Sequence, residues 1–439
     1  MVDDKLKAAY AVLGQDDPDA VTLADGMVQW IAGERGIEGF SLSGVQRFAW
    51  YDLSVKWDAT DQQRRDTLTA GAALFDALGF ERYASVLRSP QTLEIMAAHE
   101  RSYDEGLKAF QKAYTAPGID PPDLEDLEWS DIMGGEENAA QSAIGLALEQ
   151  AMDDGRMAPG SPGWKTTAKA ITTEAVDSGH PDIPGQSWRS VILTERIENS
   201  LRMLEGRSPE LQALMSGIAN RLLTPIPPPT DLELHLAPVT WFLDYVGTGI
   251  KMTGAGFLPT SMVRGGADRF GWDKGWSDDP PKKESDSMEL GALHQILLDA
   301  GAIRHHKGLA KCTRVGSRML DDAEYMWRTL AGSLTPYQWL ASVAQTYTLL
   351  LLSGEDNDDA LCDRTHTILI DYGYRAGDDV PDRWNVYSAW GHVRRPVEVL
   401  DGFSETGRYP SNKIVLNPFG EATLLERLRL DATGPMRRP

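Results

Sequence analysis

The spacing of apolar residues in the first half of the chain predicts helices. One set recurs at the intervals of a helical face and comprises Leu68, Ala72, Phe75 and Leu78. A second set has the same spacing and comprises Leu193, Ile197, Leu201 and Leu204. Gly79 and Gly206 come shortly after these sets, and glycine commonly ends a helix. The same pattern predicts further helices over 90–115, 138–155 and 208–223. We therefore predict an acidic helical domain over residues 1–223, made of one or two subdomains.

A proline-rich segment follows this helical region. It has the sequence Thr224-Pro225-Ile226-Pro227-Pro228-Pro229-Thr230, which cannot continue a helix and favours a stiff extended chain. The balance of charge changes near the same place. Asp and Glu outnumber Lys and Arg by 18 in residues 1–235, but only by 4 in residues 236–439. The two signals together predict a linker over 224–235.

One short sequence pattern occurs three times beyond this linker. Its copies are Met252–Leu258, Cys312–Gly316 and Leu416–Gly420. In each copy an apolar residue precedes Thr or Asn, and a glycine lies three positions after that polar residue. Thr and Asn are good helix N-caps, because the side-chain oxygen accepts a free N–H of the first turn. The pattern predicts a strand that runs into a capped helix, as a wing strand does in a winged-helix module.

Other signals predict two such modules. A helix is expected from about Asp286 to Ala300, with Asp286 and Glu289 at capping-box spacing and Gly301 at its end. A strand over Leu309–Thr313 and a helix from Arg314 should follow, and Thr335-Pro336 is predicted to start the second module.

The two modules also predict a duplication. Leu298-Asp299 corresponds to Leu400-Asp401, 102 residues later, and Gly316 to Gly420, 104 residues later, which puts two additional residues between the second pair of strands. The predicted fold class is mainly α, with a helical N-terminal domain followed by two winged-helix-like α+β units over 236–333 and 334–432.

A family resemblance concerns the same region. The run Tyr245–Pro259, and the later pattern from Leu298 to Ile303 through Lys307-Gly308 to Thr313 and Gly316, resemble a family of actinobacterial plasmid and mobile-element passenger proteins. The resemblance covers about residues 240–430 and implies winged-helix-like C-terminal modules. Residues 1–235 lie outside it, and the small β-rich N-terminal domain usual in that family is not evident here.

Composition narrows the classes of protein that fit. The 439 residues carry a net charge of −22, and no apolar run approaches the ~20 residues that span a bilayer. Trp339–Leu352 is the longest candidate, but Ser342, Gln345 and Thr346 interrupt it, so we expect a buried helix. No secretory signal is recognised at the N-terminus, and two cysteines, Cys312 and Cys362, cannot build a disulfide framework. A cytoplasmic protein without membrane contact is expected.

A cationic segment is the main candidate for binding. Between Asp299 and Asp321 the sequence has no acidic residue, and its basic residues are Arg304, His305, His306, Lys307, Lys311, Arg314 and Arg318. They predict a basic wing that contacts phosphates, or alternatively a solvated hairpin that balances the acidic domain. The helix before it has no Lys or Arg after Lys283, which is unfavourable for reading bases in a major groove. In the second unit Arg394 and Arg395 are followed by Pro396, which is expected to interrupt their helix.

Signals of catalysis are weak. The histidines include no metalloprotease pair, and no glycine-rich loop ends in Lys-Ser or Lys-Thr. Cys362, Asp363 and His366 are close in sequence and could suggest nucleophilic chemistry, but a helix or strand surface that holds three unrelated polar residues is the favoured explanation. The acidic run from Asp120 to Glu137 lacks calcium-loop spacing and is expected to form a solvated or docking surface. The sequence therefore assigns no catalytic, cofactor-binding or metal-ligating residue.

Three functional hypotheses remain open. The first is a non-enzymatic cytoplasmic accessory or scaffold protein, whose tandem winged-helix-like units contact a protein partner and, through Arg304–Arg318, touch DNA non-specifically. The second is an enzyme of mobile-element or phage origin, with a site assembled from distant residues such as His180 and His235. The third is an acidic inhibitor that mimics DNA, as suggested by the charge of residues 1–235. Trp272 and Trp276 could serve partner binding in the first hypothesis, or pack between modules.

Overall fold

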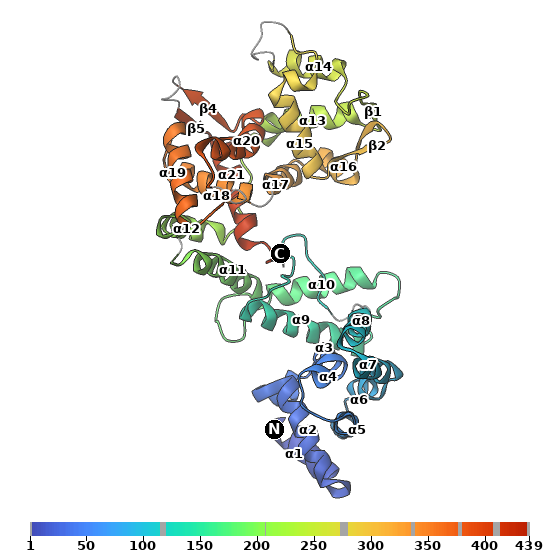
Figure 1. Ribbon diagram of the computed structural model, residues 1–439. Coiled ribbons are helices and arrows are strands. Elements are labelled where there is room, and N and C mark those ends of the chain that lie inside the picture. The colour runs from blue at the N-terminus through green and yellow to red at the C-terminus, as the bar shows by residue number, and fades with distance from the viewer. Residues whose placement is uncertain are drawn as a thin grey trace. The chain divides into compact units, whose positions relative to one another are not determined.

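The protein is mainly helical and divides into two compact units (Figure 1). A computed structural model describes residues 2–114, 120–206, 208–272, 280–334, 339–375, 380–406 and 413–436. Unit 1 comprises Met1–Ile192 with Pro435–Pro439, and unit 2 comprises Leu193–Gly434. The division falls within helix α11 (Trp188–Leu204). Thr335-Pro336 and Trp276, which carried predictions, lie outside the described residues.

Unit 1 contains helices and short helical turns in its described part. In chain order they are α1 (Val2–Asp16), α2 (Pro18–Ala32), the 3-10 turn η1 (Gly33–Gly39), α3 (Leu42–Arg47), the π-helical turn η2 (Phe48–Asp52), α4 (Leu53–Val55), α5 (Asp61–Leu78), α6 (Glu81–Arg88), α7 (Pro90–Arg101), α8 (Tyr103–Tyr114), α9 (Gly135–Asp153) and α10 (Trp164–Asp177). The helical periodicity around α5 is confirmed: Thr60 and Gln63 form a capping box, and Gly79 ends the helix with φ of 79°. The single helix expected over 90–115 is two helices, because Ser102 is extended and caps α8.

A buried carboxylate connects α9 to the helices before it. Glu149 is 3% exposed, and its two oxygens accept hydrogen bonds from the Leu42 N–H (2.5 Å) and the Tyr83 hydroxyl (2.9 Å). Burial raises the pKa of Glu149, and these hydrogen bonds oppose the rise. Burial, together with the charge of Glu149 and the hydrogen bond to it, raises the pKa of Tyr83 above its ordinary range. This interaction fixes α9 to both α3 and α6.

The proline-rich segment lies inside unit 2 rather than at its edge. It connects α12 (Pro209–Leu222) to α13 (Leu232–Val246). Ile197, Leu211 and Ile226 are buried in the same hydrophobic cluster as the helices that follow. The stripes of α11 and α12 therefore complete the core of unit 2, and the division of the chain lies about thirty residues before the predicted linker over 224–235.

The first half of unit 2 contains a segment that we call the first hairpin module. Its elements are α13, β1 (Ile250–Lys251), α14 (Thr260–Phe270), the 3-10 turn η3 (Glu284–Asp286), α15 (Met288–Asp299), β2 (Ile303–His306), β3 (Leu309–Cys312) and α16 (Arg314–Asp321). The strands form an antiparallel sheet in the order β1-β3-β2. The predicted strand and the helix from Arg314 are confirmed.

Helix α17 (Ala323–Ser333) leads to the second hairpin module. The elements of this module are α18 (Trp339–Leu352), α19 (Asp358–Asp371), α20 (Arg383–Val399), β4 (Phe403–Thr406), β5 (Lys413–Leu416) and α21 (Pro418–Thr433). Strands β4 and β5 are antiparallel, and Asn357 forms an isolated bridge with Lys413. This bridge occupies the chain position that β1 has in the first module, between the first and second helices.

The two hairpins begin at equivalent helix ends. The Ala302 N–H donates to the Leu297 carbonyl (2.9 Å), and the Gly402 N–H donates to the Val397 carbonyl (2.8 Å). Gly301 and Asp401 hold the same left-handed conformation, with φ of 64° and 53°. The helix ends are thus 100 residues apart, not 102. Two residues connect β2 to β3 and six connect β4 to β5, so four additional residues, not two, lie between the second pair of strands.

Two of the three predicted caps are present. Thr313 caps α16 by accepting from the Val315 and Gly316 N–H groups, and Asn417 caps α21 by accepting from the Gly420 N–H (2.9 Å). The first copy differs, because the Thr253 hydroxyl accepts from the Phe257 N–H and closes a turn before α14. The predicted capping box of α15 is also replaced, since Ser287 is the cap.

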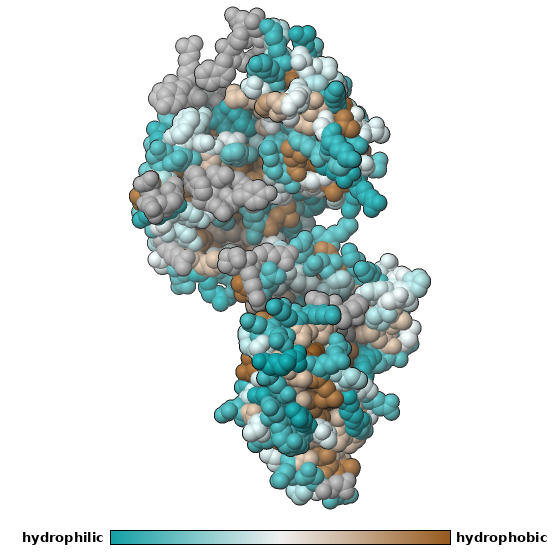
Figure 2. Space-filling view, turned by 45° about the vertical axis from the view of Figure 1, so that its right-hand side comes forward, coloured by the Kyte–Doolittle hydropathy of each residue, from teal (hydrophilic) through white to brown (hydrophobic). Residues whose placement is uncertain are grey.

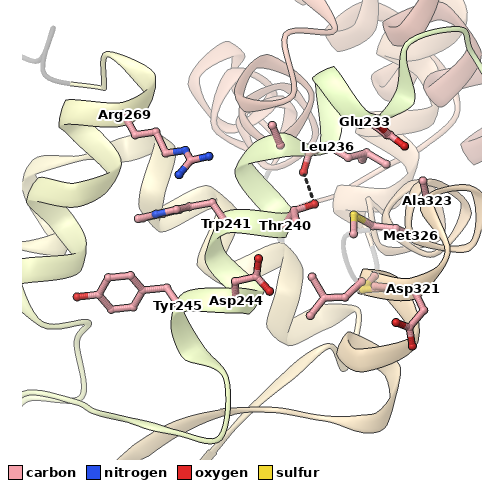
Figure 3. A pocket seen from close by; sticks show the side chains of 13 residues that line it. Glu233, Leu236, Thr240, Trp241, Asp244, Tyr245, Arg269, Asp321, Ala323 and Met326 are labelled. Carbon is pink, nitrogen blue, oxygen red and sulfur yellow. Dashed lines mark hydrogen bonds between the residues drawn. The ribbon is translucent and has the colours of Figure 1, made fainter.

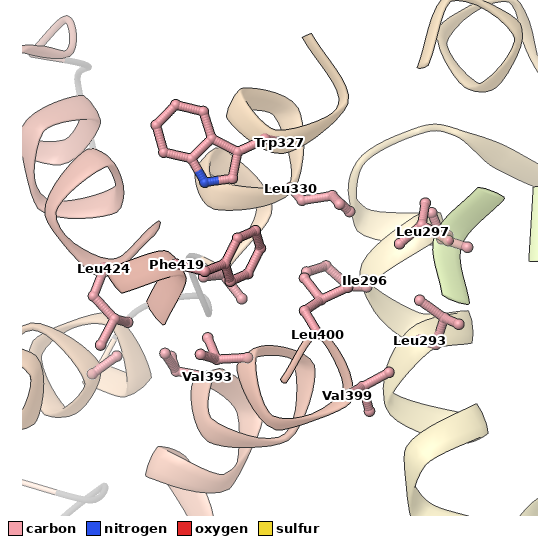
Figure 4. Close-up of a cluster of buried hydrophobic side chains, with 14 of the residues drawn as sticks. Leu293, Ile296, Leu297, Trp327, Leu330, Val393, Val399, Leu400, Phe419 and Leu424 are labelled. Carbon is pink, nitrogen blue, oxygen red and sulfur yellow. The ribbon is translucent and has the colours of Figure 1, made fainter. Parts of the chain in front are cut away.

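Helices α15 and α20 pack against each other. Figure 4 shows Leu293, Ile296 and Leu297 of α15 in one cluster with Val393 and Val399 of α20, and Leu400 beyond its end. All six side chains are buried. The third helix of each hairpin module therefore contributes to a core that the two modules share.

The glycine at the start of each last helix permits a close approach of two backbones. A Cβ on Gly420 would collide with the Gly402 carbonyl oxygen, whereas a Cβ on Gly391, inside α20, would meet no atom within 4 Å. Gly420→Ala should reduce the free energy of unfolding by about 1 to 3 kcal/mol through overpacking. Gly391→Ala, the matched control, should increase it by about 0.5 to 1 kcal/mol. Chemical denaturation measures both, and equal effects would contradict the close packing.

Candidate nucleic-acid interface

The seven predicted basic residues lie on one hairpin and the helix that follows it. Arg304, His305 and His306 are on β2, Lys311 is on β3, and Arg314 and Arg318 are on α16. Lys307 occupies the turn with Gly308, and their φ angles are 51° and 73°. All are exposed except Lys311, which is half-buried. The segment is therefore a single cationic surface, which we call the basic hairpin surface.

Two of its cations face each other across the strands. Arg304 pairs with Lys311 in the antiparallel register of β2 and β3. Side chains at directly opposite positions have Cβ atoms about 5 Å apart, and like charges there repel each other. Residues 304 and 306 share one face of β2, since side chains alternate along a strand. An anion bound on this face would relieve the repulsion.

Four cations of the basic hairpin surface differ in their ion pairing from other basic residues of unit 2. Within the described ranges, Arg304, Lys307, Lys311 and Arg314 form no ion pair, although Asp and Glu outnumber Lys and Arg by 22 in the whole chain. By contrast, Arg364 and Arg383 each pair with two carboxylates. A shallow pocket beside the hairpin is lined by Arg304, Thr313, Arg314, Ser317, Arg318 and Asp321, together with Cys312. Its guanidinium and hydroxyl groups are suited to phosphate oxygens.

His305 has a different role from its neighbours. Its side chain lies on the other face of β2, and its Nε2 is 2.9 Å from Nε2 of His294 on α15. His294 Nδ1 is 2.5 Å from a carboxylate oxygen of Glu284. The other oxygen of Glu284 accepts from the Leu258 N–H at 2.7 Å. His305 is thus part of a hydrogen-bonded chain that joins η3, α15 and β2, and its contact with phosphate stays a prediction.

The hydrogen bond to Glu284 fixes one proton of this pair. A carboxylate only accepts, so Nδ1 of His294 carries a hydrogen, and one of the two Nε2 atoms of His294 and His305 donates to the other. Burial raises the pKa of Glu284, but the hydrogen bonds from His294 and Leu258 more than offset it, and the pKa is below its ordinary value. Burial and the neighbouring His294 lower the pKa of His305. The spacing of residues in the sequence did not predict these hydrogen-bonded side chains, because they come from three different elements.

The arginines predicted in the second module are not part of a comparable surface. Helix α20 continues through Pro396 to Val399, so the expected interruption is absent. Arg394 is 6% exposed and pairs with Asp358 at 3.2 Å. Arg395 pairs with Glu398 within the same helix. Ionic partners inside the module therefore occupy both guanidinium groups.

The remaining polar candidates have structural partners. The Cys362 thiol is buried, which raises its pKa, and it contacts the Arg383 carbonyl. His366 Nε2 lies 2.7 Å from the Pro381 carbonyl. His180 is 3.1 Å from Glu136 in unit 1, and His235 Nδ1 is 2.9 Å from the Leu400 carbonyl in unit 2. Within the described part of the chain, no group of three or more His, Cys, Asp or Glu residues could hold a metal ion.

The acidic run is not uniformly solvated. Glu137 is fully buried and accepts hydrogen bonds from the N–H and hydroxyl of Ser130. Burial also raises the pKa of Asp120.

In unit 2, Trp272 is 8% exposed and packs on Trp241 and Phe270. Packing is therefore the structural role of Trp272.

A second hollow lies in unit 2 along α13 (Figure 3). Arg269 of α14 borders one side, and Asp321 and Met326 of α16 and α17 border the other. No sequence signal identified it, because its walls come from segments up to ninety residues apart. The face of the molecule shown in Figure 2 carries hydrophilic residues interspersed with small hydrophobic patches.

Comparisons with protein-family models, with curated proteins and with solved structures find no match to this chain. Among the described residues, no helix is both long enough and apolar enough to cross a membrane.

The proton arrangement at His305 predicts acid sensitivity. Because the pKa of His305 is lowered on folding, its contribution to stability is complete above the unfolded pKa of about 6.5 and is lost as pH falls below it. His305→Gln keeps an N–H donor but does not titrate, so its thermal midpoint should fall less than that of the wild type between pH 7.5 and pH 5. His306→Gln is the matched control and should retain the wild-type pH dependence. Identical pH dependence in all three proteins would contradict the assignment.

Proposed function

We propose that this protein is a non-enzymatic cytoplasmic accessory protein whose two hairpin modules are winged-helix-like units. The order of elements in the first module supports this, since helix, strand, helix and helix precede a two-stranded wing. The sheet order β1-β3-β2 also agrees, because the first strand lies beside the second strand of the wing. The bridge of Asn357 supports the same interpretation of the second module.

The packing of α15 argues for a role other than reading DNA sequence. In winged-helix and helix-turn-helix proteins the third helix enters the major groove. Here α15 packs on α20, and it contains no Lys or Arg. Gln295 and Asp299 are among its exposed polar side chains, and Gln295 donates to Asp299. Such a helix presents few donors to base edges.

The basic hairpin surface supports a second part of the proposal, which is contact with duplex DNA through phosphates alone. The observation that carries it is the opposition of Arg304 and Lys311, two cations without an ionic partner in the described structure of a strongly acidic protein. Contacts to phosphates position a protein on DNA but carry no sequence information directly. We therefore propose weak, salt-sensitive binding that does not depend on sequence, combined with protein contacts made elsewhere on unit 2.

The phosphate contact can be tested with paired charge substitutions. Arg304→Gln with Arg314→Gln should weaken binding to a labelled duplex about tenfold at low salt. The slope of log affinity against log salt should become less negative by about 2, because each lost phosphate contact removes about 0.9. Fluorescence anisotropy over a salt series measures both quantities.

The control double variant removes two positive charges as well, but from the second hairpin module. Arg383→Gln with Arg395→Gln removes two cations that already pair with carboxylates, so affinity and slope should change little. An equal loss in both double variants would mean that only net charge matters, and the proposed surface would be rejected. A scrambled duplex should bind the wild type equally well.

A further inference from the structure

One face of α13 forms the floor of a groove. The residues that line it recur every three or four positions and comprise Glu233, Leu236, Ala237, Thr240, Trp241, Asp244 and Tyr245. At 1.5 Å per residue this face is about 18 Å long, or three helical turns. The groove has a volume of about 660 Å³. A linear binding surface of this length matches a short helix better than a compact small molecule.

The walls of the groove come from α14 on one side of α13, and from α16 and α17 on the other. Figure 3 shows Arg269 and Tyr245 at one side of α13, and Met326 and Asp321 at the other. Met326 is buried and Leu320 is 37% exposed. Thr240 and Trp241 are half-buried on the floor, where Thr240 donates to the Leu236 carbonyl. Leu320 and Trp241 therefore provide accessible apolar surface in the groove, whereas the Met326 side chain is covered.

The rim of the groove is acidic. Glu233, Asp244 and Asp321 are exposed, and none of them forms an ion pair in the part of the chain that the structure describes. The one cation of the lining is Arg269, whose guanidinium lies 5.6 Å from the Phe270 ring. Three carboxylates against one guanidinium give the rim a net negative charge. An apolar floor with a negative rim is complementary to an apolar stripe flanked by cations.

We propose that this groove binds an amphipathic helix of a partner protein, with apolar side chains on one face and Lys or Arg on both sides of that face. The apolar stripe would pack on Trp241 and Thr240, and the cations would lie near Asp244 and Asp321. This inference deepens the protein-contact part of the proposed function, and it does not depend on the basic hairpin surface.

A second copy of this chain is a poorer occupant on grounds of charge. The chain carries a net charge of −22, so a second copy meets the negative rim with overall repulsion. The densest cationic segment of the chain is a hairpin followed by an eight-residue helix, not an amphipathic helix of three turns. A basic partner protein has neither disadvantage.

The proposal can be tested with the full-length protein and a designed probe. The probe is a fluorescein-labelled helical peptide of about 15 residues, with Leu along one face and Lys on both sides. We expect saturable binding by anisotropy, and at least about tenfold weaker binding of the same peptide with Glu in place of Lys. Asp244→Asn with Asp321→Asn should weaken the Lys peptide about fivefold, and this difference should shrink at high salt.

Two matched variants separate the groove from general effects. Asp268→Asn with Asp299→Asn removes two exposed carboxylates of α14 and α15 outside the groove, and should leave peptide affinity unchanged. Leu234→Ala changes a 72% exposed side chain of α13 that does not line the groove, and should also have no effect. Ala237→Trp fills the floor and should abolish peptide binding, while an unchanged circular-dichroism spectrum and thermal midpoint show that unit 2 remains folded.

Several outcomes would overturn the proposal. These are equal binding of the Lys and Glu peptides, equal effects of the groove and control variants, or no peptide binding at all. Sedimentation that shows a wild-type dimer lost in Ala237→Trp would assign the groove to a second copy instead. If the arginine variants lose duplex binding but keep peptide binding, the result bears on the basic hairpin surface and leaves the groove proposal unchanged.

Discussion

The apolar contact between α15 and α20 determines what the rest of unit 2 can do. Ile296 of the first hairpin module is buried with Val399 and Leu400 of the second. Each module is small, and a shared core buries more apolar surface than either could bury alone. The contact also buries one face of α15, which in the proposed winged-helix interpretation is the helix expected to face DNA.

The two modules keep the same backbone geometry where their hairpins meet their last helices. Thr313 in one and Asn417 in the other accept N–H groups of the first turn, and glycine follows three residues later in both. Gly316 approaches the Ala302 carbonyl as Gly420 approaches the Gly402 carbonyl. The surfaces nevertheless differ, because Arg394 and Arg395 of α20 pair within their module, whereas Arg304 and Arg314 form no ion pair with a described residue. Shared geometry therefore carries two different charge arrangements.

Local patterns predicted the elements but not their pairing. The helices α5 and α11 follow from apolar spacing, because the periodicity extends over several turns. The helix Trp339–Leu352 was predicted from a long apolar run with polar interruptions. Strand β1 has two residues and Asn357 forms a single bridge, which is too short for any alternation to be visible. The basic residues of the hairpin were predicted from the composition of that segment. The histidine chain and the groove along α13 could not be predicted from the sequence, since residues such as Glu284 and His305 meet only after folding.

At the turn residue Lys307, the backbone conformation and the positive charge favour different amino acids. A two-residue hairpin turn with positive φ at both positions favours Asn or Gly first, and Lys there is held at roughly 1 kcal/mol above its relaxed conformation. The strained residue is also the cation at the tip. Exchanging Lys307 for Asn would thus relax the backbone while it deletes a charge. Any drop in affinity from that exchange would have an electrostatic origin, because the altered tip folds more favourably than the native one.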